Sequence, residues 1–121
     1  MNSRREGRYW EDQAGRYLRS HGLRVLQARY RCRFGEIDLV CADREWLVIV
    51  EVRARGRGSL VRPLETIDAT KRRKLVQTTR HLLMTHPHWS ERPLRFDVVS
   101  IEDIDGAHPR YDWVRNAFEA E

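Results

Sequence analysis

The chain has 121 residues, 40% hydrophobic and 34% charged, which is the composition of a single globular domain over residues 1–121 rather than a disordered chain. Its longest apolar run, residues 46–50, is too short for a membrane span, and its charged start lacks the apolar core of a signal peptide, so we expect a cytoplasmic protein with no membrane partner. The net charge is +5, but residues 97–121 carry seven acidic and two basic side chains, so the remainder holds +10. That excess indicates either a polyanionic partner, nucleic acid above all, or a solvated basic surface.

The hydrophobic pattern predicts an α/β domain with a mixed sheet. The expected elements are a helix over residues 5–21, strands over 24–30, 36–42 and 46–53, a basic loop over 54–63, a helix over 68–84, a strand over 95–101, and a short strand or irregular segment over 111–118. Three strands in close succession favour an antiparallel meander. The fourth strand follows a helix, so we expect it to run parallel to its neighbour after a right-handed crossover.

The second and third strands each carry an acid within an apolar run, in the stretch GEIDLVCADREWLVIVEVRAR. If the hairpin turn is centred between Arg44 and Glu45, Asp38 lies directly opposite Glu51, with Cβ atoms roughly 5 Å apart. One face of the hairpin would then show Glu36, Asp38, Glu51 and Arg53. The other face would be core, made of Ile37, Leu39, Cys41, Val48, Val50 and Val52.

Two opposed carboxylates repel each other, so a compensating charge is expected between or beside Asp38 and Glu51. Mg²⁺ or Mn²⁺ would serve, since hard cations bind a few carboxylate oxygens and keep several waters, and the carbonyl of Val52 could add a ligand. With Arg53 beside it, such a site could hydrolyse a phosphodiester. The alternative is that both acids pair with arginines on a solvated sheet face. A further strand acid, Asp97, is expected to be structural and to accept bonds from nearby basic groups.

The residues also resemble a known family. The chain contains G-E-I-D, followed after twelve residues by E-V-R. This pattern resembles the D-x(n)-E-x-K core of the restriction-endonuclease-like PD-(D/E)XK nuclease superfamily. More narrowly, the chain resembles the YraN family of small, functionally uncharacterised bacterial proteins, over roughly residues 7–118. The residues that carry this resemblance are Gly7 and Glu11 with AGRYL, then RYRCRFGEIDLV, LVIVEVRAR, Lys71 and RFDVVSI. That family is similar in fold to archaeal Holliday junction resolvases.

The resemblance implies a restriction-endonuclease-like fold with Asp38 and Glu51 as metal ligands and Glu11 as the helix acid that completes the site. Arg53 stands where the motif has lysine, so the chain departs from the pattern there. Arginine keeps the charge and can bind phosphate bidentately, but it cannot release a proton at useful pH. Because 21 of the 23 basic residues are arginine, compositional drift explains this exchange without indicating whether catalysis is retained.

Basic residues after the hairpin would contact DNA phosphates, which position a duplex without reading its sequence. The candidates are Arg55, Arg57, Arg62, Lys71, Arg72 and Lys74. We therefore expect a metal-dependent DNA endonuclease that recognises structure, including branched DNA. Two alternatives stay open, namely a non-catalytic DNA-binding module and an interaction subunit whose charges only keep it in solution. Resolvase-like relatives act as dimers, so the resemblance also suggests a homodimer.

Overall fold

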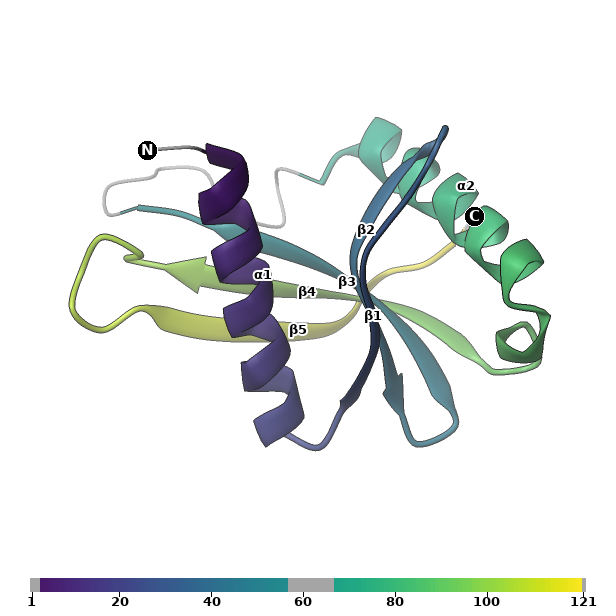
Figure 1. Cartoon of the computed structure of the whole chain (residues 1–121), viewed down its shortest axis with the longest axis horizontal. Coiled ribbons are helices and arrows are strands. Elements are labelled where there is room, and N and C mark those ends of the chain that lie inside the picture. The colour runs from purple at the N-terminus through teal and green to yellow at the C-terminus, as the bar shows by residue number, and fades with distance from the viewer. Residues whose placement is uncertain (1–2, 57–66, 121) are drawn as a thin grey trace.

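The computed structural model describes residues 3–56 and 67–120 and arranges them as a sheet with one helix on each face (Figure 1). The elements are α1 (Ser3–Ser20), β1 (Arg24–Cys32), β2 (Gly35–Asp43), β3 (Trp46–Ala54), α2 (Ala69–Thr85), a short 3-10 turn (Pro87–Trp89), β4 (Leu94–Glu102) and β5 (Arg110–Phe118). Within the described ranges, no helix is long and apolar enough to cross a lipid bilayer.

The sheet confirms the expected mixed α/β fold. Its strand order is β1-β2-β3-β4-β5. Strands β1, β2 and β3 form an antiparallel meander, β4 lies parallel to β3, and β5 lies antiparallel to β4. The parallel pair requires the crossover that contains α2. The last segment, which the sequence left as a strand or irregular chain, is a full strand.

The predicted register of the central hairpin is confirmed. Paired residues run from Asp43 opposite Trp46 to Leu39 opposite Val50, around a turn at residues 44 and 45. Beyond Leu39 the regular pairing ends, and the main-chain N–H of Val52 donates instead to Oδ2 of Asp38, at 2.8 Å. A side chain thus takes the place of a backbone acceptor at the point where β2 and β3 separate.

A second irregularity lies on the other side of β2. Arg29 has a φ of 55° and stands between the pairs Ala28–Leu39 and Tyr30–Ile37. Positive φ is uncommon for a residue with a Cβ, and within a strand it disrupts the alternation of side chains between the two faces. The outer end of the β1–β2 hairpin therefore turns relative to the rest of the sheet.

This turn corrects the expected division of the hairpin into a polar and an apolar face. The cluster under α1 includes Ala14, Leu18, Leu39, Cys41, Val48 and Val50, with Val52 partly buried against it. The cluster under α2 includes Ile37, Val40, Leu47, Ile49, Leu75 and Leu82. Ile37 thus joins the opposite core from Leu39. The face that carries the acids is not a solvated surface, because it continues into this second core.

Asp97 confirms the expected structural role. It is buried in β4 and accepts hydrogen bonds from Arg95 Nε at 3.1 Å, Trp113 Nε1 at 2.9 Å and the main-chain N–H of Asn116 at 2.9 Å. These bonds join β4 to β5 beside the irregular register between Phe96 and Val98. Asp97 therefore fixes the edge strand to the sheet.

We expect Asp97→Ala to lower the free energy of unfolding by roughly 2–4 kcal/mol, because Arg95 Nε, the Trp113 indole N–H and the Asn116 main-chain N–H lose their acceptor, while Arg95 keeps its bond to Asp43. Urea unfolding followed by circular dichroism measures this change. Asp112→Ala, at an exposed position of β5, is the matched control and should change stability by less than about 0.5 kcal/mol. Equal stabilities of the two variants would contradict the structural role.

Candidate active site

Asp38 and Glu51 lie together in a pocket with a volume of 160 Å³, between the separating strands β2 and β3 and the first turns of α2. We call this the acid pocket. Its lining residues are Gly35, Glu36, Asp38, Glu51, Arg53, Ile67, Lys71, Lys74, Leu75 and Thr78. The volume holds a cation with several waters, because one water needs only about 10–15 Å³ of such space.

Both acids of the pocket are in an unfavourable electrostatic environment. Asp38 is only 7% exposed. Burial and the charge of Glu51 raise the pKa of Asp38 above its ordinary value, although the N–H of Val52 opposes this shift. Burial also raises the pKa of Glu51, and the charge of Arg53 opposes that rise. The two carboxyl groups lie close enough together for each to affect the pKa of the other.

Glu11 of α1 lies close enough to Asp38 for the two carboxyl groups to interact. Burial, followed by the charge of Asp38, raises the pKa of Glu11 to about 7. Arg29 Nη1 lies 3.4 Å from Glu11 Oε1 and 3.1 Å from Asp12 Oδ1, and holds the Glu11 carboxyl in place. The helix acid implied by the family resemblance thus lies within electrostatic reach of Asp38.

Arg53 contacts the acid beside it. Its Nη2 lies 3.5 Å from Oε1 of Glu51, so the expected pairing of a strand acid with an arginine holds for Glu51. It does not hold for Asp38, which forms no ion pair with an arginine or lysine among the described residues. The Nε of Arg53 is buried and has no hydrogen-bond partner in the described part of the chain. Such an unsatisfied donor is costly unless a ligand accepts from it.

The predicted basic residues divide into four groups. Lys71 and Lys74 line the acid pocket, and the charge of Lys71 lowers the pKa of Glu51. Arg72 lies on the same turns, but its Nε donates to the carbonyl of Ile67 and its guanidinium stacks over Phe118. Arg55 is half-buried just beyond β3. Arg57 and Arg62 lie outside the described residues.

The first turns of α2 are fixed in place by two contacts. Asp68 is the N-cap, and its Oδ1 accepts from the N–H of Lys71 at 2.9 Å. Gly35, at the start of β2, has a φ of 148°, and a Cβ there would lie 3.2 Å from Thr78 Oγ1 of α2. Only glycine lets the hairpin come this close to the helix, and this closeness sets Lys71 and Lys74 over the acids.

The donor set fits a hard divalent cation bound by few protein ligands. Two buried carboxylates that repel each other need a positive charge between them, and Mg²⁺ is usually held by one or two carboxylates plus waters. The site does not contain a complete protein cage, because the described residues include no group of three or more His, Cys, Asp or Glu arranged to hold a metal. In the described part of the chain, Glu11 does not form a three-ligand group with Asp38 and Glu51.

These pKa shifts predict that the metal-free protein loses stability as the pH rises. Between the ordinary carboxyl values near 4 and the raised pKa of about 7 for Glu11, the folded state binds more protons than the unfolded state. The free energy of unfolding therefore falls as the pH rises through this window. Thermal unfolding in EDTA across this range measures the slope, and saturating Mg²⁺ should reduce it by favouring the ionised acids.

The control for this pH dependence is Glu45→Gln, because Glu45 is exposed in the turn of the central hairpin and does not line the acid pocket. It should keep the slope of the parent protein, whereas Glu11→Gln should make it shallower. A stability that rises steadily over the same pH range in EDTA would contradict the raised pKa values of these acids.

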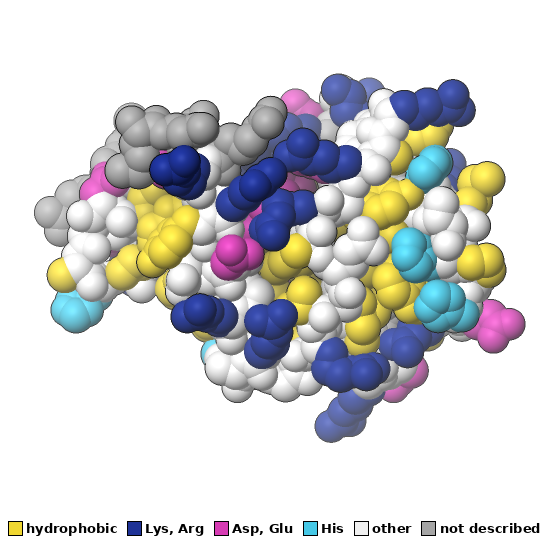
Figure 2. Space-filling view, viewed as in Figure 1, with side chains coloured by type: hydrophobic (Ala, Val, Ile, Leu, Met, Phe, Trp, Pro, Cys, Tyr) yellow, Lys and Arg dark blue, Asp and Glu magenta, His cyan; other side chains and the backbone are white. Residues whose placement is uncertain are grey.

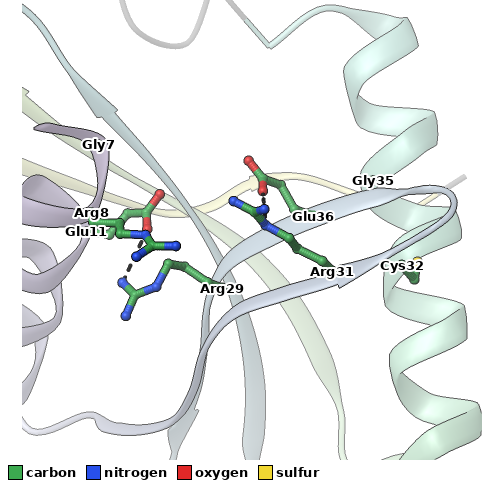
Figure 3. Close-up of a pocket in the computed structure, with 8 residues that line it drawn as sticks. All are labelled: Gly7, Arg8, Glu11, Arg29, Arg31, Cys32, Gly35 and Glu36. Carbon is green, nitrogen blue, oxygen red and sulfur yellow. Dashed lines mark hydrogen bonds and ion pairs between the residues drawn. The ribbon is translucent and has the colours of Figure 1, made fainter. Parts of the chain in front are cut away.

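A second, larger pocket adjoins the acid pocket, and the sequence did not predict it. It has a volume of 550 Å³ and lies between α1 and the β1–β2 hairpin (Figure 3). We call it the arginine groove. Its lining residues are Gly7, Arg8, Glu11, Arg29, Arg31, Cys32, Gly35 and Glu36. In space-filling view, Lys and Arg side chains gather between the upper part of α1 and the hairpin (Figure 2).

The sequence contains a spacing of residues that could have indicated part of this groove. Arg29 and Arg31 alternate along β1, and Arg8 precedes Glu11 by three positions, the spacing that puts two side chains on one helix face. The docking of that helix face on the hairpin depends on the tertiary fold, so the pattern alone did not bring these residues together.

Comparison with known proteins places this chain near a set of bacterial proteins. Residues 10–101 match the uncharacterised protein family UPF0102. The UPF0102 protein of Pseudomonas fluorescens is 43% identical over 119 residues, covering 98% of this chain and 97% of that protein. The UPF0102 protein of Alcanivorax borkumensis is 39% identical over 115 residues, covering 95% and 92% respectively. These descriptions name no activity, so the chemistry must be inferred from the site.

Proposed function

The chain belongs to the uncharacterised protein family UPF0102, and from its site we propose that it is a metal-dependent DNA endonuclease of the restriction-endonuclease-like type. The observation that carries the proposal is the pairing of two carboxyls, the buried Asp38 and the partly buried Glu51, in a pocket that also contains Lys71 and Arg53. A buried acid pair is unfavourable for folding, and a cation-dependent reaction gives a reason for its presence.

Asp38, Glu51 and the carbonyl of Val52 would hold Mg²⁺ or Mn²⁺. When bound, the metal would activate a water and neutralise charge on the phosphate. The side chains of the pocket have complementary tasks. Arg53 and Lys71 would face the negative phosphate oxygens, with the guanidinium of Arg53 exchanging its contact to Glu51 for a phosphate. Glu11, with its pKa raised to about 7, can take up or release a proton near neutral pH.

The choice of DNA as the substrate rests on charge. Apart from its last 25 residues the chain has a net charge of +10, and the basic side chains of α1, β1 and α2 surround the acids. Contacts to phosphate carry no sequence information, so we propose selection by DNA structure, including flapped and four-way junctions. Nothing in the described pockets provides a ladder of groups for reading base edges.

A non-catalytic DNA-binding module is the second candidate, and two observations favour it. Arg53 replaces the lysine of the motif and pairs with Glu51, and the described residues include no group of three metal-ligating side chains. The same basic surface would then bind DNA without cutting it.

Cleavage of labelled DNA tests the proposal. Duplex, flapped and four-way-junction DNA would each be incubated with the protein in Mg²⁺, in Mn²⁺ and in EDTA. We expect cutting that requires the metal and that favours the branched substrates. No cutting of any substrate, together with binding that weakens steeply with salt, would overturn the enzyme and leave the DNA-binding module. No cutting and no binding would overturn both.

A further inference from the structure

The arginine groove lies directly beside the acid pocket and shares part of its wall. Gly35 and Glu36 line both pockets, and Glu11 lines the groove while interacting electrostatically with Asp38. The groove is formed by three elements, α1, β1 and β2, whereas the acid pocket is closed by α2. A chain that passes through the acid pocket would therefore continue into the groove.

Two arginines of the groove are paired with carboxylates of the protein itself. Arg31 Nε lies 3.0 Å from Glu36 Oε2 and Arg29 contacts Glu11 (Figure 3). Arg29 also contacts Asp12. Arg31 and Glu36 are both about half exposed, at 53% each. Exposed ion pairs of this kind are weak, so a phosphate could exchange for the carboxylate at little cost. Phosphate is also the better partner, since a guanidinium binds it bidentately.

The backbone of β1 supports a binding role for this face. Arg29 adopts a positive φ at the break in pairing between β1 and β2, and this break turns the outer hairpin that carries Arg31 and Glu36. Such conformations are unfavourable for a residue with a Cβ and tend to persist where a site needs them. Here the positive φ of Arg29 directs its side chain toward α1, away from the direction that it would have in a regular strand.

We propose that the arginine groove binds the DNA backbone next to the phosphate that lies over the acids, with Arg8 and Arg31 contacting phosphates and Glu36 holding the place of a phosphate when DNA is absent. This inference rests on the proposed function, since it requires DNA at the acid pocket. It adds residues on the α1 side of the site to the basic residues of α2 on the other side. DNA would then cross the site from α2 to α1.

DNA affinity as a function of salt tests the groove without relying on cleavage. Fluorescence anisotropy of a labelled duplex would be measured in EDTA for the parent, Arg8→Gln and Arg31→Gln. Each variant should bind more weakly and should reduce the slope of log affinity against log salt by about 0.9, the value for one lost phosphate contact. Arg24→Gln, at the exposed other end of β1, removes the same charge and should keep most of the parent's slope and affinity.

Two variants at Glu36 distinguish the effect of a direct phosphate contact on DNA affinity from the effect of the protein's net charge. Glu36→Gln should tighten binding, because it releases Arg31. The double variant Arg31→Gln with Glu36→Gln leaves the net charge of the parent unchanged, and it should still bind DNA more weakly. If the double variant binds as the parent does, or if Arg24→Gln weakens binding as much as the groove variants, the groove is overturned while DNA binding stands. If the parent binds no DNA, the proposed function fails and the groove fails with it.

Discussion

Asp38→Asn should abolish metal-dependent cleavage and also make the metal-free protein more stable. The side chain is buried, its pKa is raised by burial and by the charge of Glu51, and it forms no ion pair with a basic residue in the described part of the chain. A neutral amide of the same shape removes the repulsion, and its oxygen can still accept from the N–H of Val52. One pKa unit corresponds to about 1.4 kcal/mol, so we expect a gain of roughly 1–2 kcal/mol near pH 8.

The loss of activity should be larger in free-energy terms than the gain in stability. Replacing residues that only orient a metal ligand costs about 10–100-fold, so loss of a direct ligand should exceed about 100-fold in the single-turnover rate. Thermal unfolding in EDTA and in Mg²⁺ gives a second measurement. The parent should be stabilised by Mg²⁺, whereas Asp38→Asn should gain little from it.

Glu45→Gln is the matched control for this comparison, because it removes an exposed carboxylate of the same hairpin that lines neither the acid pocket nor the arginine groove. It should leave the cleavage rate within a few-fold of the parent and should not raise the stability in EDTA. A less stable Asp38→Asn would show that the carboxylate serves the fold rather than a cation. Unchanged cleavage by this variant would exclude Asp38 as a ligand.

Part of the candidate site could be predicted from the sequence of the central hairpin alone. Its register follows from the alternation of apolar residues and the short turn, so the approach of Asp38 to Glu51 could be predicted. The same alternation failed at Ile37, because the positive φ of Arg29 shifts the side chains beyond it to the other face. No local pattern marks a strand residue that will adopt this conformation.

The remainder of the site depends on how the helices dock. Glu11 was placed at the site by family resemblance, but its contact with Arg29 needs α1 to pack on the turned hairpin. Lys71 was predicted to contact DNA phosphates because it belongs to a run of four basic residues, 71–74, near the start of α2. Its position beside Glu51 follows from the close approach of Gly35 to Thr78, which is a tertiary contact.

This position of Lys71 leads to the second large prediction. By resemblance Arg53 stands where the nuclease motif has lysine, yet the acid pocket contains two lysines supplied by α2, Lys71 and Lys74. The charge of Lys71 reaches Glu51. If Lys71 supplies the ammonium that faces the reacting phosphate, Lys71→Gln should lower the single-turnover cleavage rate by about 100–1,000-fold, the typical cost of one lost charge-stabilising donor. Binding of DNA should fall far less, by the equivalent of about one phosphate contact.

Replacing Arg53 with lysine should then have only a small effect on the cleavage rate. Arg53→Lys keeps the positive charge beside Glu51, and with Lys71 already in the pocket it should change the rate by less than about tenfold. Arg73→Gln is the matched control, because Arg73 lies on the same turns of α2 but donates to Thr70 and does not line the pocket. It should reduce binding slightly and leave the single-turnover rate of bound DNA unchanged.

If the effects of the Lys71 and Arg53 variants were reversed, position 53 rather than Lys71 would supply the charge that faces the reacting phosphate. If Arg53→Lys raised cleavage strongly while Lys71→Gln altered only the affinity and its salt dependence, the strand position would carry the phosphate charge and arginine would be a poor substitute there. That outcome would fit the geometry of Arg53, whose bulky guanidinium is already paired with Glu51 and must release it to reach a phosphate. A lysine in its place would be a compact charge with three freely rotating donors. The two outcomes differ in which variant changes the rate of bound DNA, so one set of single-turnover measurements decides between them.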